Sequence, residues 1–217
     1  MRLSDKYRPQ TLADVVGQPA VNMLRRFTAA PYKCCWLLEG PPGCGKTTAA
    51  YALAHELGCV DDFSGLIEVT STELTIDRCR QLFTETLRLR PMEGNGFHVL
   101  LLEEFEACVS VPVQRYLKVA LETRLPEKCV VVATSNGAGA VEKALLQRFK
   151  ILVFSGGPMF AETAHERLVD VWLKESPDPC LPAGWQRWGF SSDGQSFSMR
   201  LALDELQDAL ALQGALA

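Results

Sequence analysis

The stretch Gly40-Pro41-Pro42-Gly43-Cys44-Gly45-Lys46-Thr47-Thr48 has the pattern G-x-x-x-x-G-K-T, and it decides how the rest of the chain is interpreted. An apolar run at 34–38 precedes it, and a helix-forming run at 47–57 follows it. Glycines allow the backbone to turn so tightly that its N–H groups face inward, beside the positive end of the following helix. The stretch therefore predicts a phosphate-binding loop rather than a Gly/Pro turn between two core elements.

Two side chains of this loop have roles that follow from the pattern. Lys46 can reach the outer phosphates of a nucleoside triphosphate, and the Thr47 hydroxyl can bind Mg²⁺. The pattern thus predicts a nucleoside triphosphate with Mg²⁺ as the ligand pair. The expected nucleotide contacts are Gly40, Pro41, Pro42, Gly43, Cys44, Gly45, Lys46, Thr47 and Thr48.

Length and composition are those of a globular protein with one substantial core. The 217 residues include 47% apolar and 22% charged residues, and the net charge of −4 gives no overall attraction to nucleic acid. No segment is long and apolar enough to span a membrane, and the polar stretch 1–6 lacks a secretion signal. The 8 cysteines contain no C-x-x-C pair, so free thiols are expected. We expect a cytoplasmic or nucleoid-associated protein with no membrane contact.

Strand-like and helix-like segments alternate after residue 30, which predicts a parallel sheet with covering helices. The expected strands are the short apolar runs at 34–38, 66–69, 99–102, 129–133 and 151–154. The stretch Ser155-Gly156-Gly157-Pro158 is typical of a linker, and two helical patterns follow it, one at 160–172 and one at about 199–212. The expected fold class is α/β, a P-loop NTPase core with a five-stranded parallel sheet, followed by a small all-helical lid domain. The expected domains are 1–155 and 156–217.

Two acidic residues end the apolar run that begins at His98. Glu103 and Glu104 fall where a parallel strand reaches its carboxyl end, which is where ligands bind in such sheets. There Glu103 can contact Mg²⁺ through its waters, and Glu104 can orient or activate an attacking water. The alternative is a strand that runs into a solvated acidic turn, since Glu106 follows as well. The phosphate loop upstream favours the first interpretation.

Two further polar residues leave alternatives open. Asn136 follows the apolar run at 129–133, so its amide can hydrogen-bond a γ-phosphate or the attacking water, or it can cap a Ser-Asn turn. Arg148 can be a solvated cation at the end of a helix, or it can reach into the site of a neighbouring subunit.

In this order the motifs resemble those of the AAA+ ATPases, and specifically the clamp-loader group of replication factor C small subunits and their bacterial counterparts. The stretch 6–18, KYRPQTLADVVGQ, is similar to that group's opening signature. The resemblance implies an ATPase in which Asn136 is the first sensor, Arg148 is the arginine finger for the adjacent subunit, and Arg200 contacts the γ-phosphate. The adenine contacts that it implies are Tyr7, Arg8, Pro9 and Val16.

The resemblance also implies partners. Clamp loaders form a ring or partial ring of subunits in which the ATP state controls binding to a sliding clamp and to primer-template DNA, in replication or repair. Arg80 and Lys118 match positions on two DNA-facing helices, where they would contact phosphates rather than bases. Each can equally be a solvated helix charge.

Three features depart from the family pattern. Glu103 stands where the family usually has Asp, and the extra methylene moves the carboxylate by about 1.5 Å, so weak ATPase activity is expected as one outcome. Gln147-Arg148-Phe149 keeps only the arginine of the usual Ser-Arg-Cys. No collar domain is expected after the lid. Two alternatives therefore stay open: a catalytically silent nucleotide-binding scaffold subunit of a hetero-oligomer, or another DNA-acting AAA+ motor for branch migration or fork maintenance.

Overall fold

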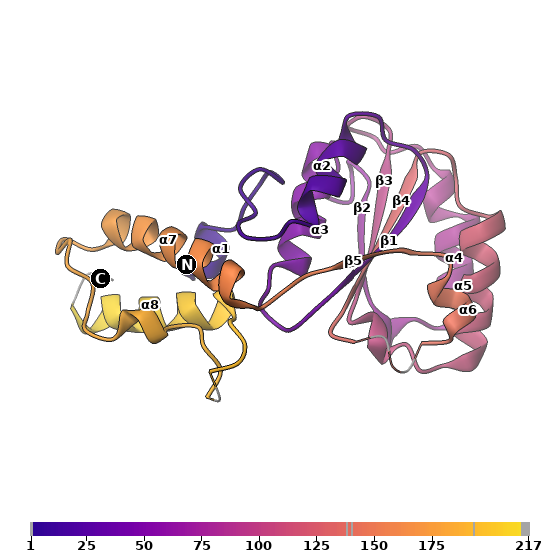
Figure 1. Ribbon diagram of the computed structural model, residues 1–217. Coiled ribbons are helices and arrows are strands. Elements are labelled where there is room, and N and C mark those ends of the chain that lie inside the picture. The colour runs from indigo at the N-terminus through magenta and orange to yellow at the C-terminus, as the bar shows by residue number, and fades with distance from the viewer. Residues whose placement is uncertain (1, 138, 140, 193, 214–217) are drawn as a thin grey trace.

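A parallel sheet with helices on both faces and a separate group of helices make up the fold (Figure 1). The computed structural model describes residues 2–137, 139, 141–192 and 194–213. The strands are β1 (Cys34–Glu39), β2 (Leu66–Thr70), β3 (His98–Glu103), β4 (Cys129–Ser135) and β5 (Lys150–Val153). All neighbours pair in parallel, in the order β2-β3-β4-β1-β5. The predicted five-stranded parallel sheet is confirmed.

The inner strands β3, β4 and β1 are apolar on both sides and are covered on both faces, while β5 at one edge leaves Ile151 and Val153 exposed. The α-helices are α1 (Leu3–Lys6), α2 (Val21–Thr28), α3 (Lys46–Glu56), α4 (Ile76–Thr84), α5 (Val111–Thr123), α6 (Lys143–Leu146), α7 (Pro158–Glu175) and α8 (Met199–Leu212). The short 3-10 helices are η1 (Ser71–Glu73), η2 (Thr86–Arg88), η3 (Phe105–Ala107) and η4 (Trp185–Arg187). Side chains alternate along each strand, so Trp36 and Leu38 join the core under α2 and α3, while Cys35 and Leu37 join the core under α4 and α5.

The strand order places three functional segments next to one another. β1 lies between β4 and β5, and β4 lies between β1 and β3. In register, Glu39 of β1 is opposite Ser135 of β4, and Leu102 of β3 is opposite Ala133. The loop after β1, the acidic pair after β3 and the polar end of β4 therefore meet at the carboxyl edge of the sheet.

The second group of helices contains α7 and α8, together with the first helix of the chain (Figure 1). The backbone N–H of Leu3 in α1 donates to Gln207 Oε1 of α8 at 2.9 Å, and Lys6 Nζ is 2.6 Å from Glu175 Oε1 of α7. Among the described residues of this part, Phe190 and Phe197 form an isolated antiparallel bridge. The N-terminal segment thus lies against helices that come last in the sequence. The division of the chain at residue 155 stays a prediction.

Among the residues described, no helix has both the length and the apolar character needed to cross a bilayer.

Candidate nucleotide-binding site

A cavity of about 380 Å³ opens at the carboxyl edge of the sheet, beside the loop that follows β1. Side chains from the N-terminal segment, from α7 and from α8 complete its walls. The predicted site residues that line it are Tyr7, Arg8, Pro9, Val16, Pro42, Gly43, Cys44, Gly45, Lys46, Thr47, Thr48, Glu103, Glu104, Asn136 and Arg200. Segments far apart in the sequence therefore share one cavity of a size suited to a small ligand.

The loop after β1 is held from two sides. The backbone N–H of Gly40 donates to the Ser135 carbonyl at 3.1 Å, and that of Met199 donates to the Gly43 carbonyl at 3.0 Å. Gly43 has φ +74°, and a Cβ atom there would lie 1.9 Å from Ser198 Oγ, at the start of α8. Only glycine satisfies both the backbone conformation and this close approach. The loop is therefore fixed in shape and is in direct contact with the start of α8.

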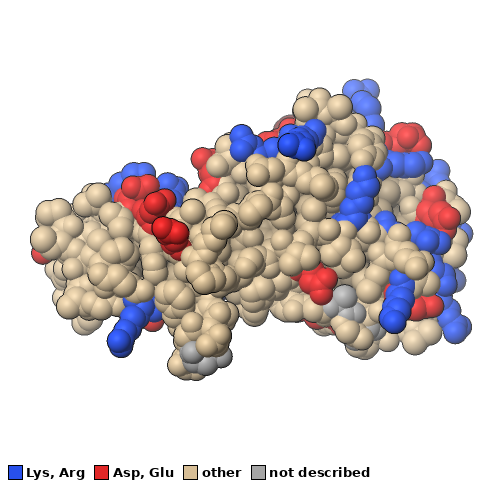
Figure 2. All heavy atoms as spheres, in the orientation of Figure 1, with Lys and Arg blue, Asp and Glu red and all other residues tan. Residues whose placement is uncertain are grey.

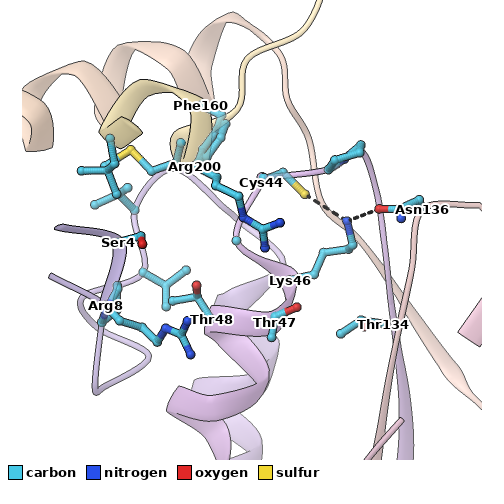
Figure 3. A pocket seen from close by; sticks show the side chains of 18 of the residues that line it. Ser4, Arg8, Cys44, Lys46, Thr47, Thr48, Thr134, Asn136, Phe160 and Arg200 are labelled. Atoms are coloured by element: carbon cyan, nitrogen blue, oxygen red, sulfur yellow. Dashed lines mark hydrogen bonds between the residues drawn. The ribbon is translucent and has the colours of Figure 1, made fainter. Parts of the chain in front are cut away.

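The Lys46 side chain is buried and lies across the loop (Figure 3). Its ammonium donates to the carbonyls of Gly40 and Pro41, both at 2.7 Å, and to Asn136 Oδ1 at 3.0 Å. Burial lowers the pKa of Lys46, while the neighbouring Cys44 and Glu106 act in the opposite direction. An anion bound at the loop would favour the charged ammonium, so these residues fit a phosphate group.

The acidic pair lies at the end of β3, as the sequence predicts. Glu103 is the last residue of this strand, and burial is the main cause that raises its pKa, followed by the charges of Glu68 and Glu104. Arg8 and Arg200 act in the opposite direction. A divalent cation would relieve this crowding of carboxylates, and hydroxyl and carboxylate oxygens are ligands that Mg²⁺ accepts. Together with Thr47 on the cavity wall, Glu103 therefore fits a magnesium site.

The N-terminal segment forms the opposite side of the cavity and connects two helices. The Tyr7 hydroxyl donates to Glu175 at the end of α7, and the Arg8 guanidinium lies 5.3 Å from the centre of the Tyr51 ring on α3. Burial, and then the contact with Glu175, raises the pKa of Tyr7 to about 12, so this phenol stays protonated at neutral pH. The segment that carries the expected base contacts is thus attached to both parts of the fold.

Five predicted residues lie outside the cavity walls. Gly40 and Pro41 contribute through the carbonyls that bind Lys46. Arg148 is 2.8 Å from Glu122 on α5, Arg80 is 3.1 Å from Asp77, and Lys118 is 3.9 Å from Glu142. The structure does not bring these three cations to the cavity, and their expected roles concern other molecules. Those roles stay predictions.

The cavity also contains residues that the sequence did not single out for this site. Arg167 of α7 lines it without an ion pair to any described residue, and Glu106 lines it beside Asn136. The further lining residues include Ser4, Asp14, Val15, Thr70, Thr134, Ser135, Phe160, Met199 and Leu203. Glu106 had a signal, since it continues the acidic run after β3. No sequence pattern pointed to Arg167, because only the packing of α7 places this residue at the cavity.

Comparison with known protein families and sequences identifies relatives of this chain. Residues 36–156 match the family described as ATPase family associated with various cellular activities (AAA). The chain is 30% identical over 210 residues to the replication factor C small subunit of Archaeoglobus fulgidus, covering 96% of this chain and 63% of that protein. It is also 30% identical over 175 residues to replication factor C subunit 3 of Saccharomyces cerevisiae, covering 79% and 50%. The chain thus spans less than two thirds of the length of these curated relatives.

Solved structures of two proteins from Thermotoga maritima have the same fold. The Thermotoga maritima RuvB Holliday junction branch migration motor superposes with a TM-score of 0.72 at 20% identity, covering 96% of this chain and 67% of that one. A DNA polymerase III gamma subunit-related protein from Thermotoga maritima gives a TM-score of 0.62 at 16% identity, covering 89% and 60%. At these identities the likeness establishes the fold alone.

Proposed function

This chain belongs to the AAA family of ATPases, and from that premise we propose that it binds ATP with Mg²⁺ in the cavity described above and hydrolyses it. One observation carries the proposal: Lys46, the Glu103–Glu104 pair and Arg200 line the same cavity as the glycine loop. Phosphoryl transfer to water requires groups that bind the phosphates, a metal ligand, a group that activates water and a cation that stabilises the developing charge. The cavity contains a candidate for each, the cation coming from the second group of helices.

The resemblance to the clamp-loader group is confirmed by the similarity to replication factor C small subunits. We therefore propose a clamp-loader-like subunit that acts in DNA replication or repair. Residues 156–217 would serve as the lid, with α7 and α8 closing over the nucleotide. ATP binding would favour one arrangement of the sheet domain relative to the lid, and hydrolysis would remove that preference.

Each residue has a proposed task in the reaction. Lys46 would exchange its two carbonyl acceptors for phosphate oxygens, and Thr47 and Glu103 would hold the magnesium ion. That ion would supply positive charge beside the phosphate groups. Glu104 accepts a proton from the attacking water, which Asn136 helps to orient. Arg200 supports the charge that develops on the transferred group.

One specific observation favours a second candidate function. Glu103 is one methylene longer than the family's usual Asp, so the metal can be displaced and turnover can be slow. In that case the chain is a nucleotide-binding scaffold subunit of a hetero-oligomer. Steady-state release of phosphate from ATP separates the two, since only the active subunit shows turnover that depends on Lys46.

Calorimetric titration with ATP and Mg²⁺ tests the nucleotide site. We expect well-folded protein to take up ATP, and we expect Lys46→Ala to weaken the affinity roughly 10- to 100-fold, because a charge-assisted hydrogen bond to phosphate is lost. Lys33→Ala is the matched control, since Lys33 pairs with Glu127 away from the cavity. If the folded wild-type protein takes up no adenine nucleotide, the proposal is wrong.

We propose a sliding clamp, primer-template DNA and other clamp-loader-like subunits as partners. Arg80, in the middle of α4, and Lys118, on α5, are the proposed contacts to DNA phosphates. Acidic and basic side chains are interspersed over α4, α5 and α6 on the face in view (Figure 2). With a net charge of −4, any DNA contact must therefore be local and sensitive to salt.

A fluorescence titration with primed DNA at two salt concentrations tests this contact. We expect Arg80→Ala to bind more weakly than wild type, with a salt slope smaller by roughly one unit. Lys128→Ala removes an equal charge just before β4, at the amino edge of the sheet, and should match wild type. Equal affinity and equal slope for Arg80→Ala would remove that residue from the DNA surface.

A further inference from the structure

The carboxylate of Glu106 contacts a residue of the proposed catalytic centre. Asn136 Nδ2 donates to Glu106 Oε1 at 2.8 Å, while Asn136 Oδ1 accepts from Lys46 Nζ at 3.0 Å. A lysine ammonium can only donate, and an ionised carboxylate can only accept. The two neighbours therefore allow a single rotation of the Asn136 amide, with oxygen toward Lys46 and nitrogen toward Glu106.

We infer that Glu106 is a positioning residue for ATP hydrolysis, which acts by fixing the rotation of the Asn136 amide. This inference rests on the proposed ATPase function. When a phosphate binds, its oxygens compete with the Asn136 amide oxygen for the Lys46 ammonium. Glu106 is then the group that holds the Asn136 amide in place. Without Glu106, the amide can rotate and present its NH₂ group where its oxygen is needed to orient the attacking water.

Local structure explains why Glu106 reaches this position. Glu104 has φ 52°, a left-handed conformation that is rare for residues other than glycine, and it directs the chain from β3 into η3. The backbone N–H of Ala107 donates to the Glu104 carbonyl at 2.8 Å, which closes this turn. Phe105 is fully buried, with its ring centre 5.2 Å from that of Phe149. With Phe105 fixed in the core, the next side chain faces the cavity.

The remaining contacts of Glu106 suit this role. Its second oxygen, Oε2, is buried and accepts no hydrogen bond from the residues described, so Asn136 is the hydrogen-bonding partner of the carboxylate there. The negative charge of Glu106 also favours the charged form of Lys46, whose pKa burial lowers. Removal of Glu106 would therefore free the Asn136 amide to change its orientation.

Steady-state kinetics of three variants test the role. We expect Glu106→Ala to lower kcat roughly 10-fold or more with KM for ATP changed by less than about twofold, because the group acts through another residue. Glu106→Gln should retain most of the wild-type rate, since its amide oxygen can accept the same hydrogen bond. In the Asn136→Ala background, Glu106→Ala should cause no further loss. A wild-type rate for Glu106→Ala, or losses that multiply in the double variant, would overturn the inference.

Magnetic resonance of protein labelled with ¹⁵N-asparagine tests the contact without any catalysis. Asparagine occurs at 22, 95 and 136, so each side-chain amide can be followed separately. We expect Glu106→Ala to shift the Asn136 amide signals and to leave those of Asn22 and Asn95 in place, whereas a general loss of structure would move all of them. Unchanged Asn136 signals would refute the contact. If instead the wild type hydrolyses no ATP, the proposed function fails, and these signals still decide whether the contact exists.

Discussion

Replacement of Arg148 by alanine is expected to preserve ATP binding and to depress turnover roughly 10³-fold, if Arg148 completes the site of a neighbouring subunit. Within its own chain, the guanidinium is 2.8 Å from Glu122 Oε2, and its side chain is 33% exposed. Arg148 Nε is buried and finds no acceptor among the described residues. The exposed part of the guanidinium is the part that a neighbour's nucleotide would contact.

Mixing two inactive variants measures this effect in trans. Protein with Arg148→Ala retains an intact loop but lacks the arginine, and protein with Lys46→Ala retains the arginine but lacks the loop lysine. Contacts between the two kinds of subunit would restore some complete sites, so phosphate release from the mixture should exceed the sum of the separate rates. Glu122→Gln is the control, because it removes the intrachain partner and keeps Arg148. A mixture no faster than its components would contradict a shared site.

Replacement of Glu104 by glutamine is expected to reduce ATP turnover roughly 100-fold or more while ATP still binds. Glutamine has nearly the same shape as glutamate but cannot take a proton from water at neutral pH. Glu104 follows β3 directly and lines the cavity, so its carboxylate is the candidate base at this edge of the sheet. Phosphate release and calorimetry on the same preparation separate turnover from binding.

Glu103→Gln provides the matched comparison for this prediction. Because Glu103 is assigned to the metal, its loss should raise the Mg²⁺ concentration that half-maximal turnover requires, while Glu104→Gln should leave that concentration unchanged. If Glu104→Gln turns over ATP as fast as wild type, the water-activating residue has been assigned wrongly.

Much of the fold could be predicted from the sequence because its signals are local. Each apolar run from 34–38 to 151–154 is rich in β-branched residues or leucine, which identifies a strand. The run at 151–154 differs from the expected buried strand, because β5 lies at the edge of the sheet and exposes Ile151 and Val153. The helical pattern at 199–212 coincides with α8. The placement of α1 was less accessible, because a four-residue helix has no pattern of its own and is held by distant partners such as Gln207 and Glu175.

The sequence alone determined the phosphate loop, the acidic pair after β3 and the amide after β4, because each depends on residues adjacent in the chain. The tertiary structure alone decided that Glu106 faces Asn136 and that Tyr7 is bound to the end of α7. The physical reason is the strand order β2-β3-β4-β1-β5, which makes neighbours of segments that are far apart in sequence. The neighbouring residues in sequence determine whether a residue lies in a strand or a helix. The side chains that it contacts depend on which elements pack together in the core.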